Sequence, residues 1–146
     1  MRKIVLWKAV AGVLTLLAVA GCATLSNKGP VTEKAAVKKV MEQWKHGVET
    51  KNIDEVMATV SAESFASSDF KCNTDLLIGI NNSFADGSLD NAKVNLDKAQ
   101  FTVEDEKATV FPVESKSKTD VATFSFQLRR EDGKWLIVNL EQTSTK

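Results

Sequence analysis

Few side chains of this sequence have the chemistry of a base or a nucleophile near neutral pH. There is one histidine, His46, and there are two cysteines, Cys22 and Cys72. Histidine is the usual general base because its pKa lies near the pH of the cell. Counted at about 100° per residue from Val37, His46 falls on the side of its helix opposite to the apolar side chains. We therefore expect His46 to face solvent, away from any pocket in the interior of the domain.

Carboxylates are the remaining candidates for acid–base chemistry or for binding a metal. Asp69, Asp75 and Asp97 would each need an apolar cavity to become a base, and the sequence favours none of them. The segment from Asp86 to Asp90 has oxygen ligands, but it lacks the length and the final glutamate of a calcium-binding loop. We expect this segment to form a turn, and we expect no catalytic residue, no metal site and no cofactor.

Cys22 ends the run Leu17-Ala18-Val19-Ala20-Gly21-Cys22. Before it, Arg2 and Lys3 form a basic start, and residues 9–20 are almost entirely apolar. About a dozen apolar residues are too few to cross a membrane and are typical of a secretion signal. The run resembles the lipobox of bacterial lipoproteins. The resemblance implies cleavage before Cys22, a diacylglyceryl group on its sulfur and an acyl chain, such as palmitate, on the new amino terminus. The alternatives are an ordinary secretion signal and an uncleaved membrane anchor.

The lipobox interpretation divides the chain into three parts. These are a signal peptide (residues 1–21), a lipidated cysteine with its tether (residues 22–32) and one domain (residues 33–146). The lipid would attach the protein to the membrane and make it a lipid-anchored protein of the bacterial cell membrane or outer membrane. In a Gram-negative cell the outer membrane is favoured, because Ala23 rather than aspartate follows the cysteine.

The charge of the mature chain limits the classes of partner. The signal contains three of the 19 basic residues and none of the 19 acidic ones, so 16 basic and 19 acidic residues remain, a formal charge of −3. A mildly acidic domain is not expected to bind nucleic acid. Cys72 has no second cysteine with which to form a disulfide once Cys22 carries lipid. We expect Cys72 to be a small packed residue, with a reactive thiol as the alternative.

Hydrophobic periodicity predicts helices in the first half of the domain. Apolar residues recur at helical spacing, and residues that favour helix N-caps precede each apolar segment. The expected helices cover residues 33–48 with Thr32 as N-cap, residues 53–60 starting at Asn52 or Asp54, and a third segment from Asn73 or Thr74 to the turn at residues 86–88.

After residue 94 the apolar period changes from 3.6 to two, which is typical of strands. The phase of the alternation slips between Leu96 and Ala99, which predicts a β-bulge within one long strand. Asp132-Gly133 predicts a tight hairpin between the last two strands. The expected fold class is α+β, with three N-terminal helices packed on one face of a curved antiparallel sheet.

Two stretches resemble the nuclear transport factor 2-like superfamily. They are the helix that carries Trp44, followed by residues 52–56, and the closing hairpin at residues 128–137. The resemblance covers about residues 31–143 and extends to the small uncharacterised lipoprotein domains of that superfamily. It implies a cystatin-like cone, in which a curved sheet wraps around a long helix, often with a pocket inside. Members include enzymes, binding modules and dimerisation domains, so the fold alone does not select a function.

The resemblance also guides the expected function. Ketosteroid isomerases of this superfamily use an Asp base and a Tyr in the oxyanion hole, and other members use a His–Asp pair. This chain has no tyrosine, and His46 is expected outside the pocket, so neither constellation can be carried over. We expect a non-catalytic binding or assembly domain, with an envelope protein or a second copy of the chain as partner. The alternatives are a small-molecule-binding protein and a SnoaL- or ketosteroid-isomerase-like enzyme that uses a buried carboxylate.

Aromatic side chains of the predicted strands are the candidate ligand contacts. An open apolar cavity would favour small-molecule binding, a filled cone would favour an assembly module, and an enclosed cavity with a carboxylate would favour an enzyme. Aromatic residues at strand spacing also occur as plain core. The candidate ligand-binding residues are Phe101, Phe124, Phe126 and Trp135.

Overall fold

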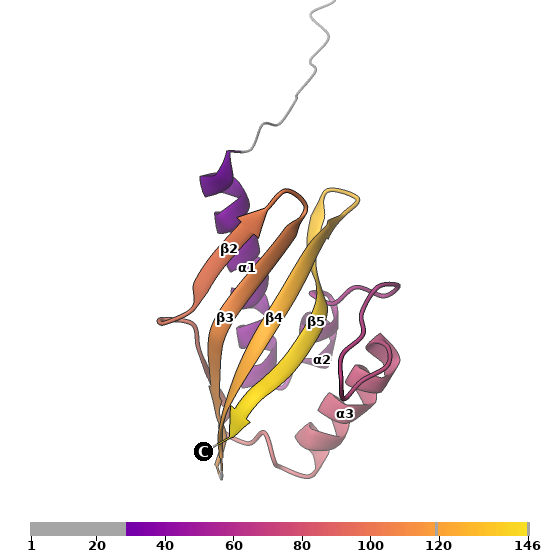
Figure 1. Cartoon of the computed structure of the whole chain (residues 1–146). Helices are drawn as coiled ribbons and strands as arrows, with labels where there is room; N and C mark the ends of the chain where they lie inside the picture. The colour runs from indigo at the N-terminus through magenta and orange to yellow at the C-terminus, as the bar shows by residue number, and fades with distance from the viewer. Residues whose placement is uncertain (1–28, 119, 146) are drawn as a thin grey trace, which may run out of the picture.

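The computed structural model describes residues 29–118 and 120–145. The predicted signal peptide, Cys22 and most of the predicted tether lie outside these residues. In the described part of the chain the helices precede the strands (Figure 1). The elements are α1 (Pro30–Glu49), α2 (Ile53–Met57), α3 (Asn73–Ala85), β1 (Lys93–Asn95), β2 (Gln100–Glu104), β3 (Lys107–Lys116), β4 (Val121–Glu131) and β5 (Lys134–Thr145).

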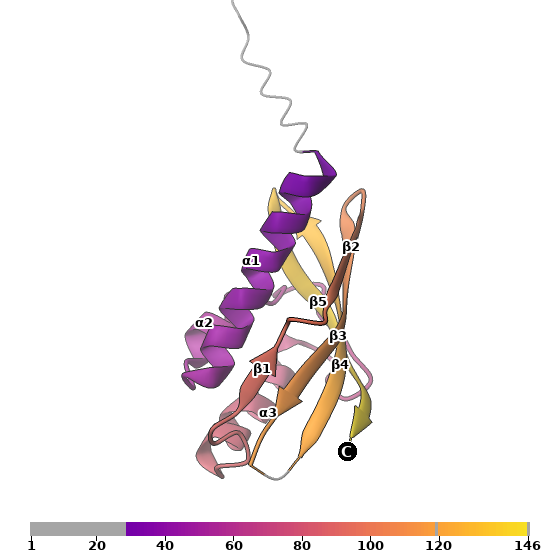
Figure 2. The ribbon, with the colours of Figure 1, turned by 90° about the vertical axis from the view of Figure 1, so that its left-hand side faces the viewer.

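The strands form one antiparallel sheet in the order β1-β3-β4-β5. Strand β2 also pairs with β3, along the part of β3 that β1 does not reach. Figure 1 shows the helices behind one face of this sheet, and Figure 2 shows α1 running along that face with α3 near one end of it. The arrangement confirms the predicted α+β fold class.

Helix α1 begins at Pro30, whereas the sequence pattern predicts a start at Glu33. Proline suits the first turn because its φ is already helical and it lacks an N–H that would have no partner. Gly29 is the N-cap. Thr32, the predicted N-cap, lies inside the first turn, where its hydroxyl donates to the carbonyl of Gly29 at 2.7 Å. The predicted apolar stripe faces the sheet, with Val37, Met41, Trp44 and Val48 buried.

Helix α2 starts at one of its two predicted positions. The side chain of Asn52 accepts the backbone N–H of Glu55 at 3.2 Å, which satisfies one of the free donors at the helix start. The helix ends at Met57, earlier than the predicted residue 60. Helix α2 packs closely on α1 because Gly47 of α1 has no side chain. A Cβ at residue 47 would lie 2.9 Å from the backbone nitrogen of Val56 in α2.

Helix α3 is capped by Cys72, not by Asn73 or Thr74 as predicted. The thiol makes no capping hydrogen bond. Instead, the carboxylate of Asp75 accepts the backbone N–H of Lys71 at 3.1 Å. The negative charge of Asp75 in the first turn also suits the positive end of the helix dipole.

The predicted long strand with a bulge is in fact two strands. β1 and β2 are separated by residues 96–99, and both pair with β3. A bulge occurs instead in β3, whose register against β4 shifts between Val110 and Val113, and the register of β4 against β5 shifts at two further places. Pro112 lies between Val110 and Val113 and has no N–H to give to the neighbouring strand, so regular pairing stops there.

The predicted hairpin between β4 and β5 is confirmed. Asp132 and Gly133 form its two-residue loop with φ values of 49° and 78°. Both values lie in the left-handed region that such a loop requires, and aspartate and glycine are the residues that adopt it most readily. Asp105, with a φ of 52°, has the same conformation in the turn between β2 and β3.

The hydrophobic core lies between α1 and the concave face of the sheet. Trp44 of α1 meets Phe126 of β4 edge to face, with ring centroids 5.4 Å apart and an interplanar angle of 73°. Both rings are buried. Within residues 29–118 and 120–145, no helix combines the length and the apolar character needed to cross a membrane.

Candidate ligand-binding cavity

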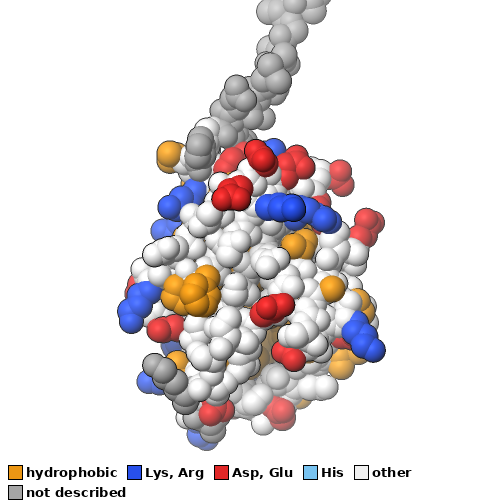
Figure 3. All heavy atoms as spheres, viewed as in Figure 1, with side chains coloured by type: hydrophobic (Ala, Val, Ile, Leu, Met, Phe, Trp, Pro, Cys, Tyr) orange, Lys and Arg blue, Asp and Glu red, His pale blue; other side chains and the backbone are white. Residues whose placement is uncertain are grey.

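A cavity of about 360 Å³ lies between α1, α3 and the sheet. Figure 3 shows a hollow in this region of the surface, with acidic side chains beside it. The volume lies in the lower part of the range of roughly 300–1,000 Å³ that small-molecule sites occupy. The walls are mainly apolar: Trp44 and Val48 of α1, Leu76 and Ile80 of α3, and Val94, Val113, Phe124 and Leu140 of the sheet.

Four polar residues line the same cavity: Asp69, Ser83, Ser115 and Gln142. Asp69 belongs to the loop between α2 and α3 and is exposed, as is Gln142 on β5. The two serines are half-buried. Serine hydroxyls and the glutamine amide both donate and accept hydrogen bonds, whereas a carboxylate only accepts them. The cavity therefore combines an apolar interior with a few polar groups that can orient a ligand.

Phe70 forms one side of the cavity by packing directly on the backbone of α3. A Cβ added to Gly79 would lie 2.7 Å from the ring of Phe70, closer than two carbon atoms can approach. The ring keeps this position because residue 79 has no side chain. The loop before α3 and the middle of α3 together therefore set the width of the cavity.

A cluster of polar side chains connects the first turn of α1 to the strand pair β4–β5, away from the cavity. The carboxylate of Glu33 is buried and accepts two hydrogen bonds, from the indole of Trp135 at 2.6 Å and from the guanidinium of Arg130 at 3.0 Å. Arg130 is also 3.6 Å from Glu106. Its guanidinium lies 6.0 Å from the centre of the Trp135 ring. The cluster fixes the start of α1 against the sheet.

A second polar cluster connects the loop after α2 to the end of β4. Glu131 accepts hydrogen bonds from Arg129 and from Ser61, each at 2.8 Å. Arg129 also donates to the hydroxyl of Ser64. The hydrogen bond from Arg129, followed by those from Ser64 and Ser61, holds the pKa of Glu131 below its ordinary value. None of these residues lines the cavity.

No family model and no curated protein matches the sequence. Solved structures do match the fold. A nuclear transport factor 2-like (NTF2-like) protein of unknown function from Pseudomonas putida KT2440 is 11% identical and covers 78% of this chain and 87% of its own, with a TM-score of 0.68. Another from Shewanella baltica OS155 is 19% identical and covers 82% and 98%, with a TM-score of 0.66. The fold is NTF2-like.

A third NTF2-like structure, from Streptomyces avermitilis, has been provisionally named a dehydratase. It is 11% identical and covers 77% of this chain and 95% of its own, with a TM-score of 0.64. The TM-scores establish the shared NTF2-like fold, and identities of 11–19% do not transfer an activity.

The NTF2-like cone separates the four residues predicted to contact a ligand. Phe124 lines the cavity. Phe126 is buried against Trp44, and Trp135 is buried in the Glu33 cluster. Phe101 lines a different groove on the outer side of α1. The structure therefore brings one of the four, Phe124, to the cavity.

Two aromatic residues line the cavity that were not proposed as ligand contacts, Trp44 and Phe70. Trp44 lies in the apolar stripe of α1, where a core role is the ordinary expectation. Phe70 lies in a loop next to Asp69, so an aromatic ring beside a carboxylate was visible in the sequence. That pair of neighbours is too common to identify a site by itself.

The candidate acid–base residues lie in different places. His46 faces solvent, as predicted: its side chain is 66% exposed and its Nδ1 lies 2.7 Å from the carboxylate of Glu55. Asp69 lines the cavity, Asp75 lies in the first turn of α3 and accepts the backbone N–H of Lys71, and Asp97 lines the outer groove. Cys72 is exposed, so the expectation of a packed residue was wrong. It precedes α3 and does not share the apolar face of that helix.

The segment from Asp86 to Asp90 forms the predicted turn. Asp86 accepts the backbone N–H of Ser88 at 2.8 Å, and this hydrogen bond lowers the pKa of Asp86. Asp90 pairs with Lys51. Across residues 29–118 and 120–145, no three His, Cys, Asp or Glu side chains gather in a way that could hold a metal ion.

Proposed function

We propose that this chain is a lipid-anchored lipoprotein of the bacterial cell envelope whose NTF2-like domain reversibly binds one small, mainly apolar molecule. The observation that carries the binding function is the open cavity of about 360 Å³ with aromatic and aliphatic walls. Apolar walls favour a ligand because binding removes apolar surface of both partners from water. A domain that serves only to assemble with other proteins needs no such space in its interior.

Binding is favoured over catalysis by the position of the one carboxylate at the cavity. An enzyme of the kind considered above would use a carboxylate buried in an apolar environment. Asp69 is exposed at the cavity instead. The remaining polar groups of the cavity are two hydroxyls and an amide, which are suited to orienting a ligand.

The start of α1 supports the anchored arrangement. Because α1 begins at Pro30, only residues 23–29 separate Cys22 from the folded domain. Seven residues span at most about 25 Å when fully extended. A lipid on Cys22 would therefore keep the domain close to the membrane surface, and two or three acyl chains would anchor it stably.

Filling the cavity should strongly weaken ligand binding without disturbing the rest of the domain. In Ser83→Phe, a ring on α3 would occupy space that the ligand needs. We expect the full-length chain in lipid nanodiscs to bind indole saturably in isothermal titration calorimetry. The variant should bind indole at least about tenfold more weakly, because the indole ring can no longer be buried in the cavity.

Ser83→Ala is the matched control, because it removes the hydroxyl without filling the cavity. Its affinity for indole should fall by no more than about threefold, since at most one hydrogen bond from the Ser83 hydroxyl is lost. Equal indole binding by Ser83→Phe and the unchanged protein would place the ligand elsewhere, and the absence of saturable binding by the unchanged protein would refute the proposed function.

A further inference from the structure

Asp69 gives the cavity a negative charge that nothing in the described structure neutralises. Among the described residues that line the cavity, it is the one with a charged side chain. Within residues 29–118 and 120–145, its carboxylate has no hydrogen bond or ion pair. An unpaired carboxylate at the edge of an apolar space favours a ligand that brings a positive charge or a hydrogen-bond donor.

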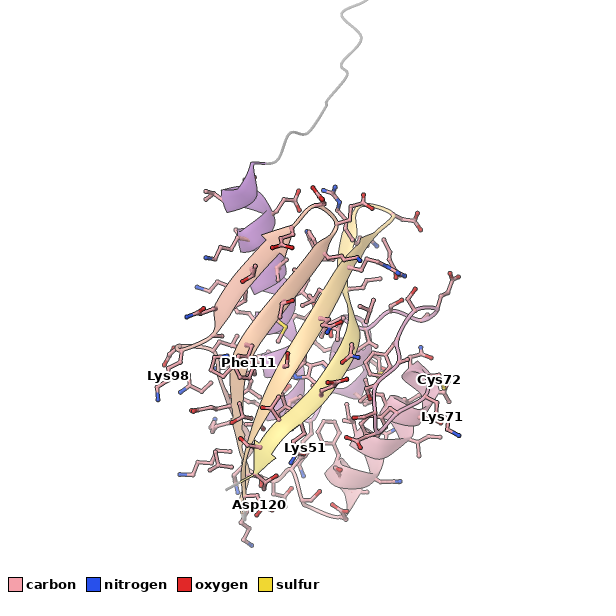
Figure 4. The ribbon with its side chains drawn as sticks, in the orientation of Figure 1. Lys51, Lys71, Cys72, Lys98, Phe111 and Asp120 are labelled. Carbon is pink, nitrogen blue, oxygen red and sulfur yellow. The ribbon has the colours of Figure 1, made fainter. Side chains whose placement is uncertain are left out.

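Neither Lys71 nor Lys51 pairs with the carboxylate of Asp69. Lys71 is two residues from Asp69, but it is exposed and does not line the cavity. Figure 4 shows Lys71 at the outer edge of the molecule, beside Cys72. Lys51 pairs with Asp90 and donates to the carbonyl of Phe84 at 3.3 Å. The negative charge at the cavity therefore remains available to a ligand.

Three aromatic rings line the cavity and strengthen the same preference. Trp44, Phe70 and Phe124 belong to α1, to the loop before α3 and to β4. The face of an aromatic ring attracts a cation, and the attraction increases where water is excluded. The rings also provide the apolar surface against which the uncharged part of a ligand can pack.

We propose that the molecule bound in this cavity is a cationic amphiphile, a small apolar or aromatic body that carries a protonated amine. The amine binds Asp69 at the edge of the cavity, and the apolar body packs among Trp44, Phe70 and Phe124. This inference rests on the proposed binding function and adds the chemical class of the ligand. An anionic ligand such as a fatty acid would place a second negative charge beside Asp69.

Three probes that share one ring system test the charge preference. Tryptamine, tryptophol and indole-3-propionate carry an ammonium, a hydroxyl and a carboxylate group on similar short chains. We expect tryptamine to bind the full-length chain in nanodiscs about fivefold more tightly than tryptophol, since Asp69 is exposed and exposed ion pairs are weak. Indole-3-propionate should bind more weakly than tryptophol. High salt should reduce the preference for tryptamine.

Asp69→Asn removes the charge with little change of shape. It should reduce the preference for tryptamine over tryptophol from about fivefold to about twofold or less, mainly by weakening the binding of tryptamine. Asp105→Asn is the matched control, because it makes the same change in a turn whose left-handed φ asparagine also adopts. This control should keep the fivefold preference.

The outcomes separate this inference from the proposed function. Equal affinity of the unchanged protein for tryptamine and tryptophol would overturn the ligand class while leaving small-molecule binding in place. An undiminished preference in Asp69→Asn would overturn the role of Asp69. Failure of all three probes to bind the unchanged protein would overturn the proposed function, and the ligand class with it.

Discussion

Replacing Glu33 with alanine is expected to lower the free energy of unfolding by about 3 kcal/mol, near the lower end of the range for breaking a buried ion pair. Glu33 is buried and is the shared acceptor for Arg130 and for the indole N–H of Trp135. Its loss would leave the buried indole N–H of Trp135 without an acceptor and Arg130 with Glu106 as its remaining ion-pair partner, and a buried donor without an acceptor is costly. The midpoint of urea unfolding, followed by circular dichroism, measures the change.

Glu42 provides the matched control on the same helix. Its carboxylate is exposed and lies 3.9 Å from Lys38 in an ordinary pair along the helix surface. Glu42→Ala should change the free energy of unfolding by less than about 0.5 kcal/mol. If Glu33→Ala destabilised the domain no more than Glu42→Ala does, the cluster at the start of α1 would not hold that helix to the sheet.

Replacing Cys22 with alanine is expected to abolish lipid attachment completely. The proposed thioether requires the sulfur of Cys22, and alanine has none. In a bacterial cell that processes lipoproteins, the variant should remain at the size of the precursor and incorporate no labelled palmitate. Metabolic labelling followed by gel electrophoresis measures both effects.

Cys72→Ala is the control for this experiment, because Cys72 is the second of the two cysteines in the chain. It is exposed in front of α3, so its thiol is open to any modification that does not depend on the lipobox. Cys72→Ala should keep the processed size and the full palmitate label. Unchanged processing and labelling of Cys22→Ala would contradict the lipobox interpretation.

Local sequence patterns were enough to predict the main elements of the fold. The stripe of α1 and the Asp132-Gly133 loop depend on neighbours within a few residues, and both are confirmed. The predicted position of the bulge was wrong because it depends on pairing between strands that are distant in the sequence. A change of phase between Leu96 and Ala99 is produced equally by one bulged strand and by two strands. The pairing of both with β3 determines which of the two occurs.

The predicted N-caps of α1 and α3 were wrong for a second reason. Thr32, Asn73 and Thr74 are all residues that favour N-caps, but each lies within the first turn of its helix. At α1 the rigid φ of Pro30 allows the helix to begin earlier. At α3 the helix begins after Cys72 without a side-chain cap, and the side chain of Asp75 instead accepts the backbone N–H of Lys71 before the helix.

Sequence patterns could not predict the cavity, for a geometric reason. Periodicity shows that Phe124 and Phe126 point to the same face of the sheet, but it does not show what lies opposite each of them. Trp44 fills the space in front of Phe126, whereas Phe124 borders the cavity. The space that remains depends on how α1, α3 and the sheet are placed relative to one another.

The position of the cavity along α1 determines where a ligand would come from. The cavity adjoins Trp44 and Val48, near the end of α1 that is farther from Pro30. The fourteen helical steps from Pro30 to Trp44 rise about 20 Å. If α1 is directed away from the membrane, a protein held by lipid at its N-terminal end would present the cavity to the surrounding fluid. Its occupancy would follow the dissolved concentration of the ligand beside the membrane, because exchange with the bilayer would require the ligand to cross water first.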